Sequence, residues 1–413
     1  MAGVLKPFPL FPGLVLLVAG LGLSGSQVAQ AGAELIGIAR IPGDVFVPGP
    51  VSGQFIDSED NAELSGILPF TLGQPVQGFS AVLSEGDGSY LVLADNGFGS
   101  KQNSPDFVLT LYRIRPDFRT AQGGSGTIEI ESAIRLRDPF GHAPFPVIAS
   151  QPDYPPDGSG VAVDPELKRR SWLTGSDFDP ESLQQAPDGT YWIGDEFGPW
   201  LLHFDVVGRL QHAPYAHSGL NSPENPVPGL QGRKTQSSGG FEGVAYDKAT
   251  QRLYAMLEKP LEPDSRLLEI HTFDMASGSF GVEPVMQYAL DEGARAAGAF
   301  QYLGDGEFAV LERDSGQGET AVIKRIYTVR RGQVDEHGVL RKRLLVDLMD
   351  IADPHGLSEE SVDGRYSFAY QTIESMVFLD ANTLGIINDN NYPFGSGPPA
   401  PEATVFILLR LTP

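Results

Sequence analysis

The chain has 413 residues and a formal charge of -24, from 53 acidic and 29 basic residues. This acidity excludes the basic surface that nucleic-acid binding needs, and it argues against docking on anionic lipid. The chain has no cysteine, which excludes disulfides, thiolate catalysis and zinc–thiolate sites. A hydrophobic content of 41%, with 49 Gly and 33 Pro, predicts a packed core joined by many turns.

The first 31 residues predict a secretory signal peptide. Lys6 is the only charge among the first 33 residues, and the apolar run at 14–23 is too short to span a bilayer comfortably. Ala29, Gln30 and Ala31 then give the A-x-A pattern of signal peptidase. We expect a signal peptide at 1–31 and one domain at 32–413. The protein should be secreted or periplasmic, with no membrane span after cleavage near Ala31.

A strand–turn–strand pattern with a polar corner then recurs along the chain. The copies lie at 78–97, 179–198, 240–260, 299–314 and 373–391. In each copy a short polar turn, such as GDG or PDG, separates two strands, which is typical of a β-hairpin. The strands are apolar on both faces, as in "LVLA" at 91–94, and this suits sheets packed face to face in propeller blades.

The remaining segments complete this interpretation. Residues 126–136 could form one further blade, and residues 211–240 read as a long loop on the functional face. The strand-like segments 33–41 and 403–411 could complete one blade together and remove free sheet edges. We therefore predict an all-β fold, a single β-propeller of about six blades closed by pairing of the N- and C-terminal strands. A two-domain β-sandwich is the alternative.

Carboxylates recur at one end of each hairpin. In an antiparallel hairpin, the start of the first strand lies beside the end of the second. The expected pairs are Glu181 with Asp195, Glu242 with Glu258, and Glu374 with Asp389. Single Asp or Asn residues at such corners could equally be turn caps. Glu is a poor turn former, so its place at the start of three strands favours another role.

These motifs resemble the phytase-like family, which is described as having the esterase-like activity of phytase. The matching blocks are "DPE" at 179–181, "DEFGP" at 195–199, "GFEG" at 240–243, "LERD" at 311–314, and "IE" at 373–374 with "NDN" at 388–390. They occur in order over about 75–395. Ser182 and Ser375 replace glycines, and Ala299 stands where an acid would be expected. The resemblance implies a propeller with a hydrolytic, phosphoester-related activity.

Several carboxylates at one mouth of a ring predict a cation site. Such groups repel by about 1–4 kcal/mol per pair at 4 Å, and a hard divalent cation removes that cost. Calcium takes 6–8 oxygen ligands from carboxylates, amides and carbonyls in flexible geometry, so we expect Ca²⁺, with the number of ions left open. The corner at 95–97 also supplies such oxygens. The candidate ligands are Glu181, Asp195, Glu196, Glu242, Glu258, Glu312, Glu374, Asp389 and Asn390.

Two cations beside these acids are candidate catalytic residues. A metal cluster could hold a phosphate and activate water, and Lys259 and Arg313 directly follow corner acids. Local ion pairs with those acids are the alternative for both. No GxSxG, GxGxxG or P-loop motif occurs. The predicted function is a secreted, calcium-dependent phosphoesterase acting on a small molecule. A lactonase or carboxylesterase on the same scaffold, and a non-catalytic metal-binding propeller, remain alternatives.

Overall fold

The computed structural model describes residues 32–57, 64, 66–155, 159–397 and 401–412. The predicted signal peptide, at 1–31, lies outside these residues. The described residues belong to one compact unit, so they do not divide as a two-domain sandwich would. In this part of the chain, no helix has both the length and the apolar character needed to cross a membrane.

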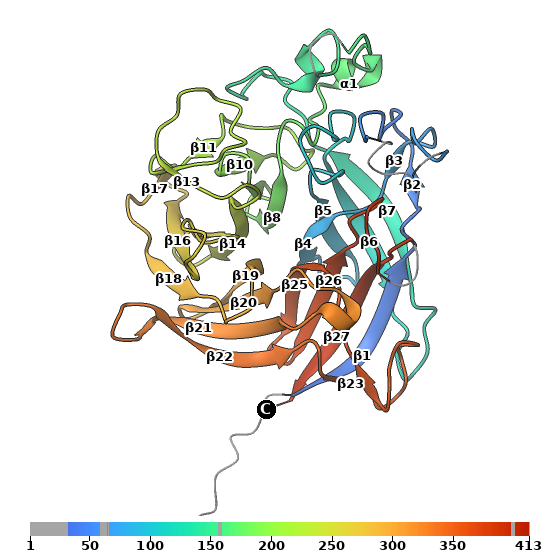
Figure 1. Cartoon of the computed structure of the whole chain (residues 1–413), viewed down its shortest axis with the longest axis vertical. Helices are drawn as coiled ribbons and strands as arrows, with labels where there is room; N and C mark the ends of the chain where they lie inside the picture. Colours follow the sequence, from blue (N-terminus) through green and yellow to red (C-terminus); the bar gives the residue numbers. More distant parts are fainter. Residues whose placement is uncertain (1–31, 58–63, 65, 156–158, 398–400, 413) are drawn as a thin grey trace, which may run out of the picture. The chain divides into compact units, whose positions relative to one another are not determined.

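Antiparallel strands form five successive groups, which we call blades 1 to 5 (Figure 1). Blade 1 consists of β4 (Phe79–Ser84), β5 (Tyr90–Ala94), β6 (Thr110–Asp117) and β7 (Thr127–Arg135). Blade 2 consists of β8 (Pro180–Gln185), β9 (Tyr191–Asp195), β10 (Trp200–Phe204) and β11 (Tyr215–Ala216). Blade 3 consists of β14 (Phe241–Asp247), β15 (Arg252–Leu257) and β16 (Leu267–Asp274), with β17 (Ser279–Phe280) and β18 (Met286–Ala289) both beside β16.

The last two blades follow the same order from the centre outward. Blade 4 consists of β19 (Ala296–Gly304), β20 (Glu307–Arg313), β21 (Lys324–Val334) and β22 (Leu340–Asp347). Blade 5 consists of β25 (Thr372–Asp380), β26 (Thr383–Asp389), β27 (Thr404–Thr412) and β1 (Gly32–Ile41). Short pieces lie between the blades: β2 (Phe46–Val47), β3 (Gln74–Pro75), β12 (Leu220–Asn221), β13 (Arg233–Lys234), β23 (Ile351–Ala352), β24 (Arg365–Tyr366) and the helix α1 (Pro165–Arg170).

The first strands of the blades surround the centre of the molecule. β4, β8, β14, β19 and β25 contact one another in that cyclic order (Figure 1), which confirms an all-β, propeller-like fold. The described strands fall into these five groups, and one parallel bridge between β1 and β7 joins blades 1 and 5 into a single hydrogen-bonded sheet. The prediction of about six blades is not confirmed. Residues 127–135 do not start a blade of their own, because as β7 they pair along the whole length of β6. β1 pairs with β27 from Gly32↔Thr412 to Ile41↔Thr404.

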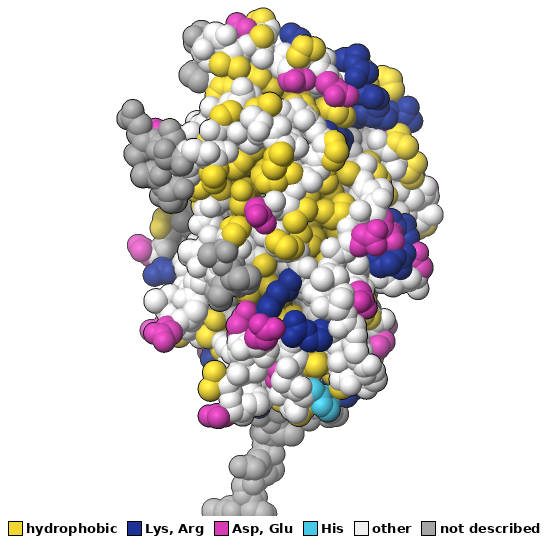
Figure 2. Space-filling view, turned by 90° about the vertical axis from the view of Figure 1, so that its right-hand side faces the viewer, with side chains coloured by type: hydrophobic (Ala, Val, Ile, Leu, Met, Phe, Trp, Pro, Cys, Tyr) yellow, Lys and Arg dark blue, Asp and Glu magenta, His cyan; other side chains and the backbone are white. Residues whose placement is uncertain are grey.

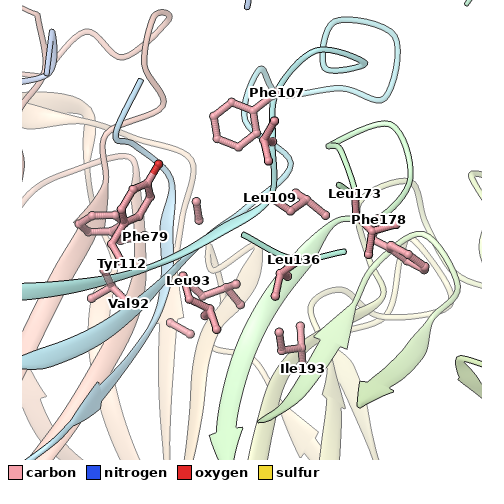
Figure 3. Close-up of a cluster of buried hydrophobic side chains, with 14 of the residues drawn as sticks. Phe79, Val92, Leu93, Phe107, Leu109, Tyr112, Leu136, Leu173, Phe178 and Ile193 are labelled. Carbon is pink, nitrogen blue, oxygen red and sulfur yellow. The ribbon is translucent and has the colours of Figure 1, made fainter. Parts of the chain in front are cut away.

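The apolar core lies between neighbouring blades. Figure 3 shows one such region, where Phe79, Val92 and Leu93 of blade 1 and Ile193 of blade 2 belong to a single buried cluster. Further clusters join blades 2 and 3, blades 3 and 4, and blades 4 and 5. Each sheet is therefore buried on both faces, which explains the continuous apolar runs in the sequence.

A β-bulge interrupts the inner strand of each blade at the same place, next to the start of the strand. A bulge adds one residue to one strand of a pair and re-aims its side chain. The residues at these bulge positions are Ser80, Glu181, Glu242, Gly298 and Glu374. The residue before each bulge pairs with a residue on the second strand of the blade. We call the next residue of that second strand the corner position. The corner positions hold Asp95, Glu196, Glu258, Arg313 and Asp389.

Candidate functional site

The corner positions and three of the bulge positions line one cavity of about 260 Å³ at the centre of the blades. We call it the acidic cavity, because eight acids line it against three bases. The acids are Asp95, Asp179, Glu181, Glu196, Glu242, Glu258, Glu374 and Asp389, and the bases are Lys259, Arg295 and Arg313. Six of the nine predicted metal ligands and both predicted catalytic cations are among them.

Asp195 and Asn390 lie outside the lining of the acidic cavity. The Asp195 carboxylate accepts the backbone N–H of Asp179 at 2.9 Å and that of Gly198 at 2.7 Å, so it caps the turn after β9. The next residue, Glu196, faces the cavity instead, because successive residues of an extended strand point to opposite sides. Asn390 Oδ1 accepts from the backbone N–H of Gly78 at 3.4 Å and so links blade 5 to blade 1.

Glu312 also points away from the acidic cavity, for the same reason. It is fully buried, and its carboxylate accepts hydrogen bonds from the Tyr288 hydroxyl and the Lys342 ammonium. The backbone N–H of Asp291 donates to it at 2.9 Å. The residue of this strand end that faces the cavity is Arg313. Blade 4 therefore contributes a cation to the cavity where the sequence predicted an acid.

Three acids of blade 2 lie closest to the arrangement that a metal ion requires. One carboxylate oxygen each from Asp179, Glu181 and Glu196 lies within 4.8 Å of the others, and all three residues are buried. The positions of two of them are fixed by neighbours: Asn96 Nδ2 donates to Asp179 at 2.8 Å, and the Gly240 N–H donates to Glu196 at 2.9 Å. A preorganised set of carboxylate oxygens is the donor set that Ca²⁺ prefers.

An unsatisfied oxygen of Glu242 is an independent indication of a cation site. Its side chain is only 3% exposed, and among the described residues its Oε1 has no hydrogen-bond partner. A buried acceptor left unsatisfied costs about 1–3 kcal/mol, and more when it is charged. A cation bound beside this oxygen would remove that cost, so the residues present fit a bound divalent ion.

Burial and mutual repulsion make the acids of the cavity hard to ionise. Burial, together with the charges of Glu242 and Asp179, raises the pKa of Glu181 well above its usual range. Burial and the charge of Asp95 do the same to the pKa of Asp389. Burial raises the pKa of Asp179 to about 6. At neutral pH the carboxyl groups of Glu181 and Asp389 must therefore keep protons or bind a cation.

Arg313 neutralises two further acids of the cavity. Its Nη2 donates to Glu258 and to Glu374, both at 2.9 Å. Burial alone would lower the pKa of Arg313, but these carboxylates outweigh it and raise the pKa further. Lys259 pairs with the other oxygen of Glu258 at 2.7 Å and donates to the backbone carbonyl of Ser238.

The bulge position of blade 4 makes room for that arginine. A Cβ on Gly298 would lie 2.2 Å from the carbonyl oxygen of Ile373 and 3.3 Å from Arg313 Nε. The residue equivalent to the acids of the other blades is therefore Gly298, whereas the sequence comparison placed the missing acid at Ala299. The error was one residue, because the bulge cannot be recognised from the hairpin pattern alone.

Three ionisable residues of the cavity, Asp95, Asp179 and Arg295, were not among the predicted site residues. Asp95 lies in the corner at 95–97, which the sequence indicated only as a source of oxygen ligands. Asp179 belongs to the motif at 179–181, but it precedes the bulge, and its direction depends on the turn into β8. Arg295 lies just before β19 and is exposed at the cavity. No periodic pattern marks Arg295, since it lies outside a regular strand.

Fold and cavity together define a class: all-β, propeller-like proteins whose blades bring carboxylates and a few cations to a central site. The chain belongs to the phytase-like family, described as having the esterase-like activity of phytase, whose model matches residues 74–392. This match confirms the resemblance noted from the motifs.

Other relatives are more distant. An uncharacterized secreted protein of Arthroderma benhamiae is 25% identical, over 35% of this chain and 36% of its own length. A Dyadobacter fermentans protein of unknown function has a TM-score of 0.41 and 12% identity, covering 92% of this chain and 100% of that one. The aldose sugar dehydrogenase of Streptomyces coelicolor has a TM-score of 0.35 and 11% identity, covering 93% and 99%. At these TM-scores the two structures add nothing to the assignment.

Proposed function

We propose that the protein is a calcium-dependent hydrolase of phosphoesters and that the acidic cavity is its active site. The observation that carries this proposal is the imbalance of eight acids against three bases around a single cavity. The family description, which names the esterase-like activity of phytase, supports the reaction class.

The proposed cation ligands come from blades 2 and 3. Asp179, Glu181 and Glu196 form the first group, and the unpartnered oxygen of Glu242 adds a further donor. A bound Ca²⁺ would supply Lewis acidity and would lower the pKa of a bound water. Asp195, Glu312 and Asn390 are left out of the set, because their side chains are engaged elsewhere.

The proposed role of Lys259 and Arg313 is to bind the phosphoryl oxygens of the substrate. Both line the cavity, and a guanidinium can hold two oxygens of a phosphate at once. In the structure both contact Glu258, so a bound phosphate would share their N–H groups with that carboxylate. The cavity would then hold metal and phosphate side by side.

A substrate panel tests this proposal. The secreted protein would be assayed on a phosphomonoester, an inositol phosphate, a lactone and an aryl ester, each with millimolar Ca²⁺ and with chelator. We expect release of phosphate that needs Ca²⁺ and is lost in Glu242→Gln. The matched control is Glu336→Gln, an exposed acid in a turn of blade 4, which should retain full activity.

The alternatives are separate outcomes of the same panel. Hydrolysis of only the lactone or aryl ester would identify a lactonase or carboxylesterase and overturn the phosphoesterase. Calcium binding without turnover of any substrate would identify a non-catalytic metal-binding propeller.

We also propose that the protein is exported, with residues 1–31 as its signal peptide. The A-x-A pattern at 29–31 and the word "secreted" in the description of the Arthroderma benhamiae relative support this. N-terminal sequencing of the protein from the culture medium or periplasm should give a start near Gly32. A start at Met1 would overturn the proposal.

A further inference from the structure

A second hollow, of about 440 Å³, lies where blade 1 meets blade 2. It shares no lining residue with the acidic cavity. We call it the basic groove, after Arg135, Arg137 and Arg170, which line it together with Trp172, Val206 and Val207. Among the described residues that line it, none is an acid. In a chain of charge -24, this is a local reversal of sign.

The sequence places two of the arginines on one face. Arg135 ends β7, and Arg137 follows two residues later in extended chain, so both side chains point the same way. Leu136 between them is fully buried on the opposite side. The third arginine, Arg170, ends α1. Figure 2 views the right-hand side of Figure 1 and shows Lys and Arg side chains at its upper right, next to Asp and Glu side chains.

Two of these three arginines lack the carboxylate partners that pair most of the other arginines in the described residues. Within the described part of the chain, neither Arg135 nor Arg137 forms an ion pair, and Arg137 Nε is buried without a hydrogen-bond partner. The Arg135 guanidinium lies over the Trp172 ring, 4.6 Å from its centroid. Burial lowers the pKa of Arg135, and its Nη2 donates to the backbone carbonyl of Pro48. Glu166 lies 3.7 Å from Arg170, but it also pairs with a neighbouring arginine.

Backbone hydrogen bonds hold the walls of the basic groove in place. The Arg137 N–H donates to the Gly208 carbonyl at 2.8 Å, and the Asp138 N–H donates to the Ser171 carbonyl at 2.9 Å. Gly208 has a φ of 76°, and a Cβ there would lie 2.8 Å from the Arg135 carbonyl oxygen. Three segments distant in sequence are thus fixed around the arginines, and an anion would bind without ordering the chain.

We propose that the basic groove binds a small molecule that carries a sulfate or phosphate group. The oxyanion would lie on the guanidinium groups of Arg135, Arg137 and Arg170, since planar N–H forks match tetrahedral oxyanions. The apolar rim of Val206 and Val207, which are 51% and 45% exposed, would contact the rest of the ligand. A hollow of this volume suits a sugar-sized molecule. This site is independent of the function proposed for the acidic cavity.

Calorimetric titration of the full-length secreted protein, freed of divalent cations and held at constant ionic strength with chloride, tests the proposal. The probes are inorganic sulfate, inorganic phosphate and glucose 6-sulfate, with glucose as the uncharged control. We expect all three anions to bind and glucose not to. Tighter binding of glucose 6-sulfate than of sulfate would identify a sugar-borne group, and equal binding would identify the free ion as the ligand.

Arginine variants locate the binding. Arg137→Gln should weaken sulfate binding about tenfold or more, because a charge-assisted hydrogen bond contributes about 1.5–3 kcal/mol. Arg170→Gln, at a half-exposed helix end, should also weaken it and keeps the test valid if Arg137→Gln does not fold. Arg266→Gln is the matched control, because Arg266 is exposed and lies outside the groove. Sulfate affinity unchanged in both groove variants would overturn the proposal, because the anion would then lie elsewhere.

Discussion

At the scale of single residues, the acidic cavity depends on which of two adjacent side chains faces inward. Asp195 and Glu196 are both acids at the end of β9, yet one caps a turn and the other lines the cavity. The hairpin pattern predicted where these residues lie along the chain. The inward direction of Glu196 follows from the alternation of side chains along β9, whereas that of Glu181 depends on the bulge in β8, which leaves no mark in composition.

Glu242→Gln tests the unpartnered carboxylate. Since Glu242 Oε1 is buried without a partner, removing its charge should stabilise the cation-free protein at pH 8 by about 1 kcal/mol. The same change should weaken calcium binding about tenfold or more, by loss of one charged ligand. Thermal unfolding with chelator and calorimetric Ca²⁺ titration measure the two effects. A loss of stability with unchanged Ca²⁺ affinity would show that Glu242 is only a packing residue.

A double-mutant cycle tests the metal group of blade 2. If Glu181 and Glu196 bind one ion, Glu181→Gln and Glu196→Gln should each weaken Ca²⁺ affinity, and the double variant should lose less than the sum of the two. Asp195→Asn is the matched control. It should cost about 1 kcal/mol of stability through the turn cap and leave Ca²⁺ affinity unchanged. Strict additivity of the two Glu variants would contradict a shared ion.

At the scale of strands, the repeated bulge turns a pattern in the sequence into a ring of side chains. The alternation of strands and turns was enough to predict hairpins, apolar faces and the propeller-like class. It did not predict the number of blades, because β7 reads as a strand that could start a blade or complete one. Whether β7 starts or completes a blade depends on the sheet edge with which it pairs. That edge is formed by residues distant in sequence.

Gly298→Ala tests whether the bulge of blade 4 is built around Arg313. The added Cβ would lie 2.2 Å from a backbone carbonyl, so we expect overpacking to cost about 1–3 kcal/mol of unfolding free energy. Gly219→Ala is the control, since its Cβ would come no closer than 3.1 Å to the His217 ring. Chemical denaturation measures both, and equal stability of the two variants would count against the close approach.

At the scale of the whole molecule, the buried acids couple folding to pH and to cations. Burial raises the pKa of Asp179 to about 6 and that of Asp195 to about 8, above the unfolded values near 4. The folded state therefore binds more protons than the unfolded state between these values. Stability from these groups is complete below about pH 4 and is lost as the pH rises through about 6 to 8.

The cation-free protein should therefore lose stability between pH 5 and pH 8, and Ca²⁺ should restore it at the upper end. Calcium binds only the ionised carboxylates of the folded state, so the gain should grow with pH. Thermal unfolding at several pH values, with chelator and with millimolar Ca²⁺, measures this. A gain of stability of the cation-free protein over this pH interval would contradict the prediction. The acids of the cavity would then be ionised in the folded state, with their charges balanced by neighbouring cationic side chains.

The pairing of β1 with β27 also determines the order in which the blades can be completed during synthesis. During synthesis β1 leaves the ribosome before the other described strands and its partner β27 after them, so blade 5 can be completed only after the other four blades have emerged. Asp389 lies at the end of β26, which needs β27 beside it. The last wall of the acidic cavity is therefore assembled after the other four. Cation binding by a nascent or truncated chain would report on whether assembly has reached its final step.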